Sequence, residues 1–163
     1  MSDQMSGETG DPLRVPREGV LFGLDYGTKR IGVAISNAEQ TMALPLESLT
    51  VRSPRLDLAY LRELTTDYRA KGLVLGLPVL KSGDESRQAA AVRQFGTWLS
   101  AELQLPVAYW DERHSSTEAE LLLWSRGESP RKRKDRLDPL AAQIILQGYL
   151  DAKDRDRAPG ALE

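Results

Sequence analysis

The sequence predicts an α/β fold in which a mixed five-stranded sheet is flanked by helices. Three extended segments come first along the chain, and helical and extended segments then alternate. Short strands joined by turns favour an antiparallel meander, whereas helical crossovers between the later strands favour parallel additions to it. With 163 residues, 40% of them hydrophobic, the chain is long enough to form one domain around a single core.

The meander is expected at the start of the domain. Residues 20–25 and 31–36 are short apolar runs, and the turn between them contains Gly27, which is available for positive φ. These runs predict a β-hairpin. A third extended segment at about Thr41–Leu49 continues the meander, and Pro45 within it indicates an edge strand or an irregular strand.

Helix and strand signals alternate in the rest of the domain. Ser53 and Pro54 supply an N-cap and a first-turn proline, so a helix is predicted to begin there. Apolar runs, apolar periodicity and a capping box of Ser115 and Glu118 then predict the remaining elements. They are a strand at 72–76, a helix at 83–103, a strand at 106–110, a helix from Ser115 and a last helix from about Asp138.

The predicted domain covers residues 19–151. Residues 1–18 are small, polar and interrupted by proline, so we expect a disordered lead, and residues 152–163 resemble a flexible charged tail. The lead lacks the apolar region of a secretory signal, and no apolar run approaches the length of a membrane span. A cytoplasmic protein is therefore expected.

The composition restricts the chemistry. The chain has no cysteine, which excludes disulfides, thiolate zinc sites and a cysteine nucleophile, and its one histidine, His114, excludes zinc sites built on several imidazoles. The formal net charge of −2 differs from that of a generally basic nucleic-acid-binding protein. Carboxylates that collect around a metal ion would, however, carry a local negative charge that the ion cancels.

Acidic residues fall where α/β sheets place their functional sites, at strand ends and helix starts. Asp25 ends the first strand, Asp111 and Glu112 follow the last strand, and Asp138 is expected to begin the last helix. Carboxylates from separate elements can hold two metal ions about 3.5–4 Å apart, which activate water for phosphodiester hydrolysis. Mg²⁺ prefers such oxygen ligands, and Mn²⁺ fits the same set.

Each acid also has a purely structural interpretation. Asp25 can shape the turn before Gly27, Asp138 can act as an N-cap before Pro139, and the acids after the last strand can be ordinary surface residues. The position of Asp25, between two apolar strands, is the hardest to explain in this way.

Four segments of the chain resemble the YqgF/RuvX family, Holliday-junction-resolvase-like relatives of ribonuclease H. They occur in the family's order and at similar intervals. They are GLDYGTKRIGVAIS (23–36), VLGLPVLKSGDESRQA (74–89), DERHSSTEAE (111–120) and DPLAAQIILQGYL (138–150). The resemblance implies a ribonuclease H-like fold and phosphodiester hydrolysis with Mg²⁺ or Mn²⁺. It also implies a role in maturing the 5′ end of the 16S ribosomal RNA precursor, although some family members are discussed as resolvases of branched DNA.

Carried onto this chain, the resemblance implies Asp25, Glu112 and Asp138 as the catalytic, metal-binding acids, with Asp111 as an additional metal-ligand candidate. Two departures concern neighbouring positions. Asn37 stands where relatives often have an acid, and His114 is followed by serines where relatives have an apolar residue and threonines. His114 can contact substrate or act as a base, but it can equally be a solvated loop residue.

Basic residues near these acids are candidates for binding the phosphates of RNA or branched DNA. A run of them precedes Asp138, and others lie in the first hairpin and in the loops after the later strands. Either a flexible charged loop or a nucleic-acid contact explains the run. The candidates are Lys29, Arg30, Lys81, Arg113, Arg131, Lys132, Arg133 and Lys134.

Two other classes of protein remain open. The segment beginning at Asp25 also resembles the phosphate loop of the actin, hexokinase and Hsp70 superfamily, but this chain supplies one such domain and no second loop. A non-catalytic binding module could keep the fold and lose the chemistry. A junction resolvase would act as a symmetric dimer, and the sequence is compatible with a monomer or a homodimer.

Overall fold

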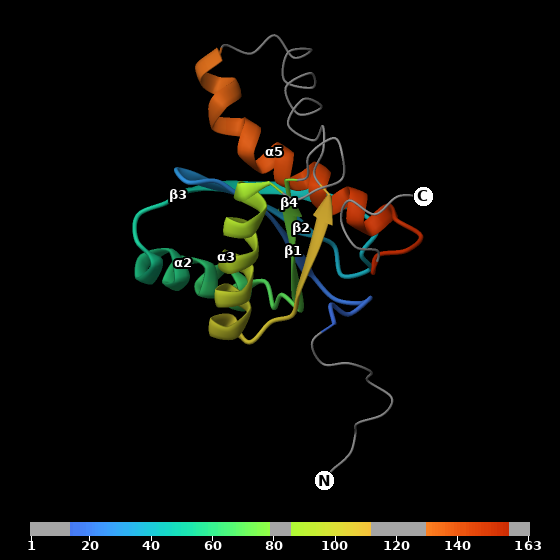
Figure 1. Cartoon of the computed structure of the whole chain (residues 1–163). Helices are drawn as coiled ribbons and strands as arrows, with labels where there is room; N and C mark the ends of the chain where they lie inside the picture. The colour runs from blue at the N-terminus through green and yellow to red at the C-terminus, as the bar shows by residue number, and fades with distance from the viewer. Residues whose placement is uncertain (1–13, 79–85, 112–129, 157–163) are drawn as a thin grey trace.

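The computed structural model describes residues 14–78, 86–111 and 130–156, and of residues 130–137 it describes the backbone alone. These ranges form a five-stranded sheet in the order β3-β2-β1-β4-β5, with helices on both faces (Figure 1). The predicted mixed α/β fold is confirmed. Its elements are β1 (Leu21–Tyr26), β2 (Arg30–Ser36), β3 (Ala43–Thr50), α2 (Pro54–Asp67), β4 (Gly72–Leu77), α3 (Arg87–Leu103), β5 (Val107–Asp111) and α5 (Pro130–Asp151).

The sheet combines the predicted meander with parallel additions. β1 pairs antiparallel with β2, which pairs antiparallel with β3, whereas β4 runs parallel to β1 and β5 runs parallel to β4. β3 is the edge strand that Pro45 predicted. The register shifts so that Val33 pairs with Glu47 and Ala34 with Pro45. Leu46 has no partner in this register, so β3 forms a bulge here, where a proline is tolerated.

Gly27 serves the β1–β2 turn by its size. Among the described glycines only Gly19 has a positive φ, of 101°, so Gly27 does not use the positive φ that is open to glycine. A Cβ at Gly27 would lie 2.7 Å from the carbonyl oxygen of Arg30. A larger residue would therefore push the start of β2 away from the end of β1.

The caps of the two helices on one face of the sheet come from serines. The predicted cap of α2 is confirmed, since Ser53 Oγ accepts a hydrogen bond from the Leu56 N–H at 3.2 Å. α3 begins at Arg87, later than expected, because Ser86 Oγ accepts from the Ala89 N–H and thereby fixes the first turn. The helix predicted from Ser115 lies outside the described residues.

The start of the last helix differs from the prediction. α5 begins at Pro130 and contains Pro139 in its interior, so Asp138 is not an N-cap and the basic run at 131–136 is helical rather than a loop. Proline suits a first helical turn, and Pro130 supplies one earlier in the chain. Pro139 removes one backbone hydrogen bond, and the packing of α5 against the sheet compensates for that loss.

Two apolar clusters separate the layers. Phe22, Leu24 and Leu75 belong to the cluster under α2 and α3, whereas the opposite face of the sheet packs against α5. The helix lies directly on the central strand. A Cβ at Gly23 would lie 2.7 Å from Leu146 Cβ and 3.1 Å from the Ala142 carbonyl oxygen.

Gln40 links described residues near the two ends of the chain. Its buried side-chain amide donates to the carbonyls of Pro16 at 3.1 Å and Gly19 at 2.9 Å. Its amide oxygen accepts from Arg155 Nη1 at 2.7 Å. Arg155 also lies over the ring of Tyr149, and burial raises the pKa of the Tyr149 phenol. The neutral ring therefore remains part of the apolar layer.

Replacing Gln40 by alanine is expected to destabilise the fold by about 1–3 kcal/mol or more, because buried polar groups lose their partners. Gln104→Ala is the matched control, since Gln104 has the same φ of 58° but is exposed. Urea unfolding of both variants would measure the difference. Equal losses would mean that left-handed backbone strain, rather than the hydrogen-bonded link, sets the cost.

Candidate active site

Asp25 lies on the face of the sheet that α5 covers. Side chains alternate along a strand, so Asp25 shares a face with Leu21 and Gly23, and both of these positions contact the α5 layer. The register pairs Asp25 with Gly32 of β2, and Gly32 in turn with Ser48 of β3. A single row across three strands therefore carries a carboxylate, a glycine and a hydroxyl.

Asp138 sits on top of this row. A Cβ at Gly32 would lie 2.0 Å from the carbonyl oxygen of Asp138 and 3.0 Å from its Cα, so the helix backbone occupies the space that a side chain would need. Antiparallel partners have Cα atoms about 4.5–5.5 Å apart. Because Asp25 is the partner of Gly32, the fold brings Asp25 and Asp138 to the same place on the sheet.

The carboxylate of Asp138 is held from the sheet side. Arg30 Nε donates to Asp138 Oδ2 at 2.6 Å, and Ser48 Oγ donates to the same oxygen at 3.3 Å. The Asp138 side chain is 20% exposed and that of Arg30 is 35% exposed. The pair is therefore partly screened by solvent and remains open to an approaching ligand. Sequence reasoning found neither Ser48 nor the pairing of Arg30 with Asp138.

Of the two acids at the end of the last strand, the structure describes Asp111 alone. Asp111 is the last residue of β5 and pairs with Leu77. Val107 and Tyr109 pack into the cluster under α2 and α3, so strand alternation puts Asp111 on that face, opposite Asp25. Glu112 lies outside the described residues.

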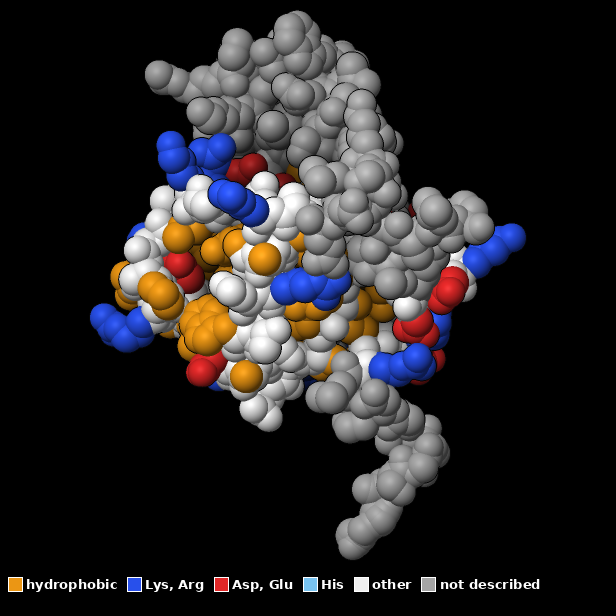
Figure 2. Space-filling view, in the orientation of Figure 1, with side chains coloured by type: hydrophobic (Ala, Val, Ile, Leu, Met, Phe, Trp, Pro, Cys, Tyr) orange, Lys and Arg blue, Asp and Glu red, His pale blue; other side chains and the backbone are white. Residues whose placement is uncertain are grey.

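The predicted basic residues are only partly described. Lys29 lies in the β1–β2 turn and its carbonyl accepts from the Val51 N–H at 2.9 Å. Figure 2 shows Lys and Arg side chains gathered at the upper left, where Figure 1 places this turn. Residues 131–134 lie on α5 about 6–10 Å along the helix axis before Asp138. Lys81, Arg113 and His114 lie outside the described residues.

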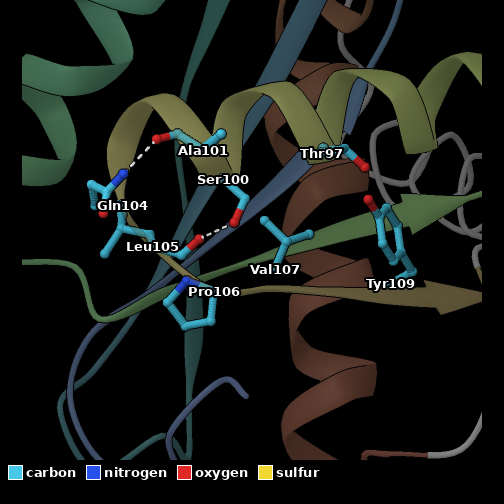
Figure 3. Close-up of a pocket in the computed structure, with 9 residues that line it drawn as sticks. Thr97, Ser100, Ala101, Gln104, Leu105, Pro106, Val107 and Tyr109 are labelled. Carbon is cyan, nitrogen blue, oxygen red and sulfur yellow. Dashed lines mark hydrogen bonds between the residues drawn. The ribbon is translucent and has the colours of Figure 1, made fainter. Parts of the chain in front are cut away.

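Two of the hollows that described residues line lie on the other face of the sheet. The larger, a cavity of about 700 Å³, lies between α3 and β5 and is lined by groups such as Thr97, Ser100 and Tyr109 (Figure 3). The smaller one is lined by Tyr26, Phe95 and other residues. Neither includes Asp25 or Asp138, and the larger has no charged side chain in its lining. The row under α5 is therefore the better candidate for chemistry on a phosphodiester.

The donor set of this row fits a hard divalent cation. Asp25 and Asp138 offer carboxylate oxygens, which Mg²⁺ and Mn²⁺ accept as ligands. Within the described residues no group of three or more potential metal ligands forms. A complete site would need a further acid, and Glu112 is the next residue after β5.

Comparison with solved structures defines the class of fold. The chain resembles Thermus thermophilus RuvC, solved with a Holliday junction substrate, with a TM-score of 0.50 over 78% of this chain and 91% of that one. At 18% sequence identity this similarity shows the fold alone. The fold is that of the RuvC-like, ribonuclease H-like nucleases.

Sequence comparison then gives the family. Residues 19–152 match the model of the RuvX family, described as "Holliday junction resolvase", and the chain belongs to that family. A relative from Chloroflexus aggregans is 41% identical over 136 residues, covering 83% of this chain and 96% of the relative. One from Cereibacter sphaeroides is 44% identical over 142 residues, covering 86% and 88%. Both carry the name "Putative pre-16S rRNA nuclease".

No described helix is both long enough and apolar enough to span a membrane.

Gly32→Ala is expected to destabilise the protein by about 1–3 kcal/mol, because the new methyl group would collide with the backbone of α5. Gly72→Ala is the control, since its nearest contact is the flexible side chain of Val15 at 3.0 Å. Thermal unfolding of the two variants would test this. A loss at Gly32 no greater than that at Gly72 would contradict the close approach of Asp138 to β2.

Proposed function

We propose that the chain is a metal-dependent nuclease that hydrolyses phosphodiester bonds and processes the 5′ end of the 16S ribosomal RNA precursor. The observation that carries the proposal is the meeting of Asp25 and Asp138 over Gly32. The names of the relatives point to the same activity and substrate. We place this activity in the cytoplasm, where ribosomal RNA would be processed.

Asp25, Glu112 and Asp138 would hold the metal in this proposal. Glu112 is preferred to Asp111, because an extended chain would return the residue after Asp111 to the face of Ala108 and Trp110, which pack in the layer under α5. A bound Mg²⁺ or Mn²⁺ would activate water and stabilise the leaving oxygen. The protein's own contribution is to fix the carboxylates on a central strand and on a helix.

The substrate backbone would run past the end of the sheet that carries the β1–β2 turn. Lys29 lies in that turn, and the basic stretch 131–134 precedes Asp138 on α5. Lysines and arginines there would neutralise phosphates and make binding dependent on salt. Lys81 and Arg113 each follow a strand by a few residues in the sequence, so we include them among the proposed phosphate contacts.

Branched DNA is the second candidate substrate. The family description and the fold of RuvC favour it, and the same carboxylates would cut either backbone. A resolvase would need a symmetric dimer that makes paired cuts, whereas a processing nuclease can act as a monomer.

Asp25→Asn is expected to lower metal-dependent cleavage about a hundredfold or more, because a metal contributes several kcal/mol to the transition state and each 1.4 kcal/mol is a factor of ten. The measurement compares a 16S precursor fragment with its 5′ leader, unstructured RNA and a four-way DNA junction. Each is incubated with Mg²⁺, Mn²⁺ or EDTA. Asp67→Asn, which changes an exposed acid at the end of α2, is the control of equal charge.

The outcomes separate the candidates. Preferential cleavage of the precursor supports ribosomal RNA processing, and paired cuts in the junction support resolution. Cleavage that survives EDTA or Asp25→Asn would overturn the carboxylate site. Binding of all substrates without cleavage of any would favour a non-catalytic module.

A further inference from the structure

The two oxygens of the Asp138 carboxylate have different surroundings. Oδ2 accepts hydrogen bonds from Arg30 Nε at 2.6 Å and from Ser48 Oγ at 3.3 Å. Within the described part of the chain, Oδ1 accepts no hydrogen bond. Among these residues the carboxylate is held through Oδ2 alone, and Oδ1 can accept a ligand.

Both donors are fixed by the sheet. Arg30 is the first residue of β2 and pairs with Thr50, and Ser48 lies on the same face of β3 through its pairing with Gly32. The helix that carries Asp138 packs so closely on β2 that its backbone occupies the space that a side chain at position 32 would need. Two rigid elements thus set the orientation of a single carboxylate.

We propose that Arg30 is a positioning residue for the metal site, which together with Ser48 holds Oδ2 of Asp138 so that Oδ1 faces the metal. This inference rests on the proposed function. It gives Arg30 a different role from the phosphate contact that its place in the hairpin suggests. Groups that hydrogen-bond a metal ligand fix its orientation, and their loss typically lowers metal affinity 10–100-fold.

The charge of Arg30 has a second effect at this place. Asp25 and Asp138 place two acidic residues beside the same glycine, and like charges that lie near one another repel. The guanidinium offsets part of this repulsion before a metal binds. Arginine suits the role because it stays charged and its planar fork keeps a fixed direction toward the carboxylate.

The test measures Mn²⁺ affinity of the full chain without nucleic acid, from the electron paramagnetic resonance signal of free Mn²⁺. Arg30→Ala is expected to weaken Mn²⁺ binding about tenfold or more. Arg30→Lys should restore part of the loss, and Ser48→Ala should weaken binding less but in the same direction. Lys29→Ala removes the neighbouring cation and should leave Mn²⁺ affinity unchanged.

A second measurement separates positioning from phosphate binding. RNA affinity in EDTA should fall with Lys29→Ala and stay near the wild-type value with Arg30→Ala. Weaker RNA binding with unchanged or tighter Mn²⁺ binding in Arg30→Ala would overturn the inference. Circular dichroism checks that each variant folds. If Arg30→Ala does not fold, Ser48→Ala provides the test. Unchanged Mn²⁺ affinity in Ser48→Ala would then overturn the inference.

Failure of the inference can be told from failure of the proposed function. If the wild type binds no Mn²⁺, or Asp25→Asn binds it as well as the wild type does, the carboxylate site itself is wrong and the inference falls with it. If Asp25→Asn abolishes binding while Arg30→Ala and Ser48→Ala do not change it, only the positioning role is overturned.

Discussion

The close approach of α5 to the sheet is the constraint on which the rest of the structure depends. It is possible because the central strands carry glycine where the helix crosses them. At Gly23 a methyl group would meet Leu146, and at Gly32 it would meet the backbone of Asp138. Close packing of this kind leaves the helix little freedom to shift. The position of Asp138 relative to Asp25 thus depends on glycine at positions 23 and 32, where a side chain would push α5 away from the sheet.

The sheet could be predicted from the sequence because its signals are local. The meander, the edge position of the strand with Pro45 and the serine cap of α2 all follow from short-range pattern, and the structure agrees with them. The start of α5 could not be found in this way. Asp138-Pro139 has the form of a helix start, but Pro130 begins the helix earlier, and tertiary packing tolerates a proline in its interior.

In the candidate site, too, residues with a local sequence signal could be predicted, whereas contacts between distant segments could not. Asp25 could be found because it lies between two apolar strands, a position that turn formation alone explains poorly. Arg30 was recognised as a cation but not as the partner of a residue 108 positions away. Ser48 carried no local signal at all, because its role follows from strand register and from the bulge beside it. Contacts between distant segments depend on three-dimensional geometry that residue types do not encode individually.

A chain with a net charge of −2 can still bind a polyanion if its acidic and basic groups are separated in space. The carboxylates are gathered under α5, where Arg30 already neutralises one of them and a divalent cation would neutralise more. Lys29 lies in the β1–β2 turn, and the sequence of the first turns of α5 is basic. Net charge therefore says little about such a protein, because the field that a phosphate meets depends on where the charges lie. A nucleic-acid backbone would contact the basic residues first. Its phosphate would approach the carboxylates only where a metal ion lies between the phosphate and the carboxylates.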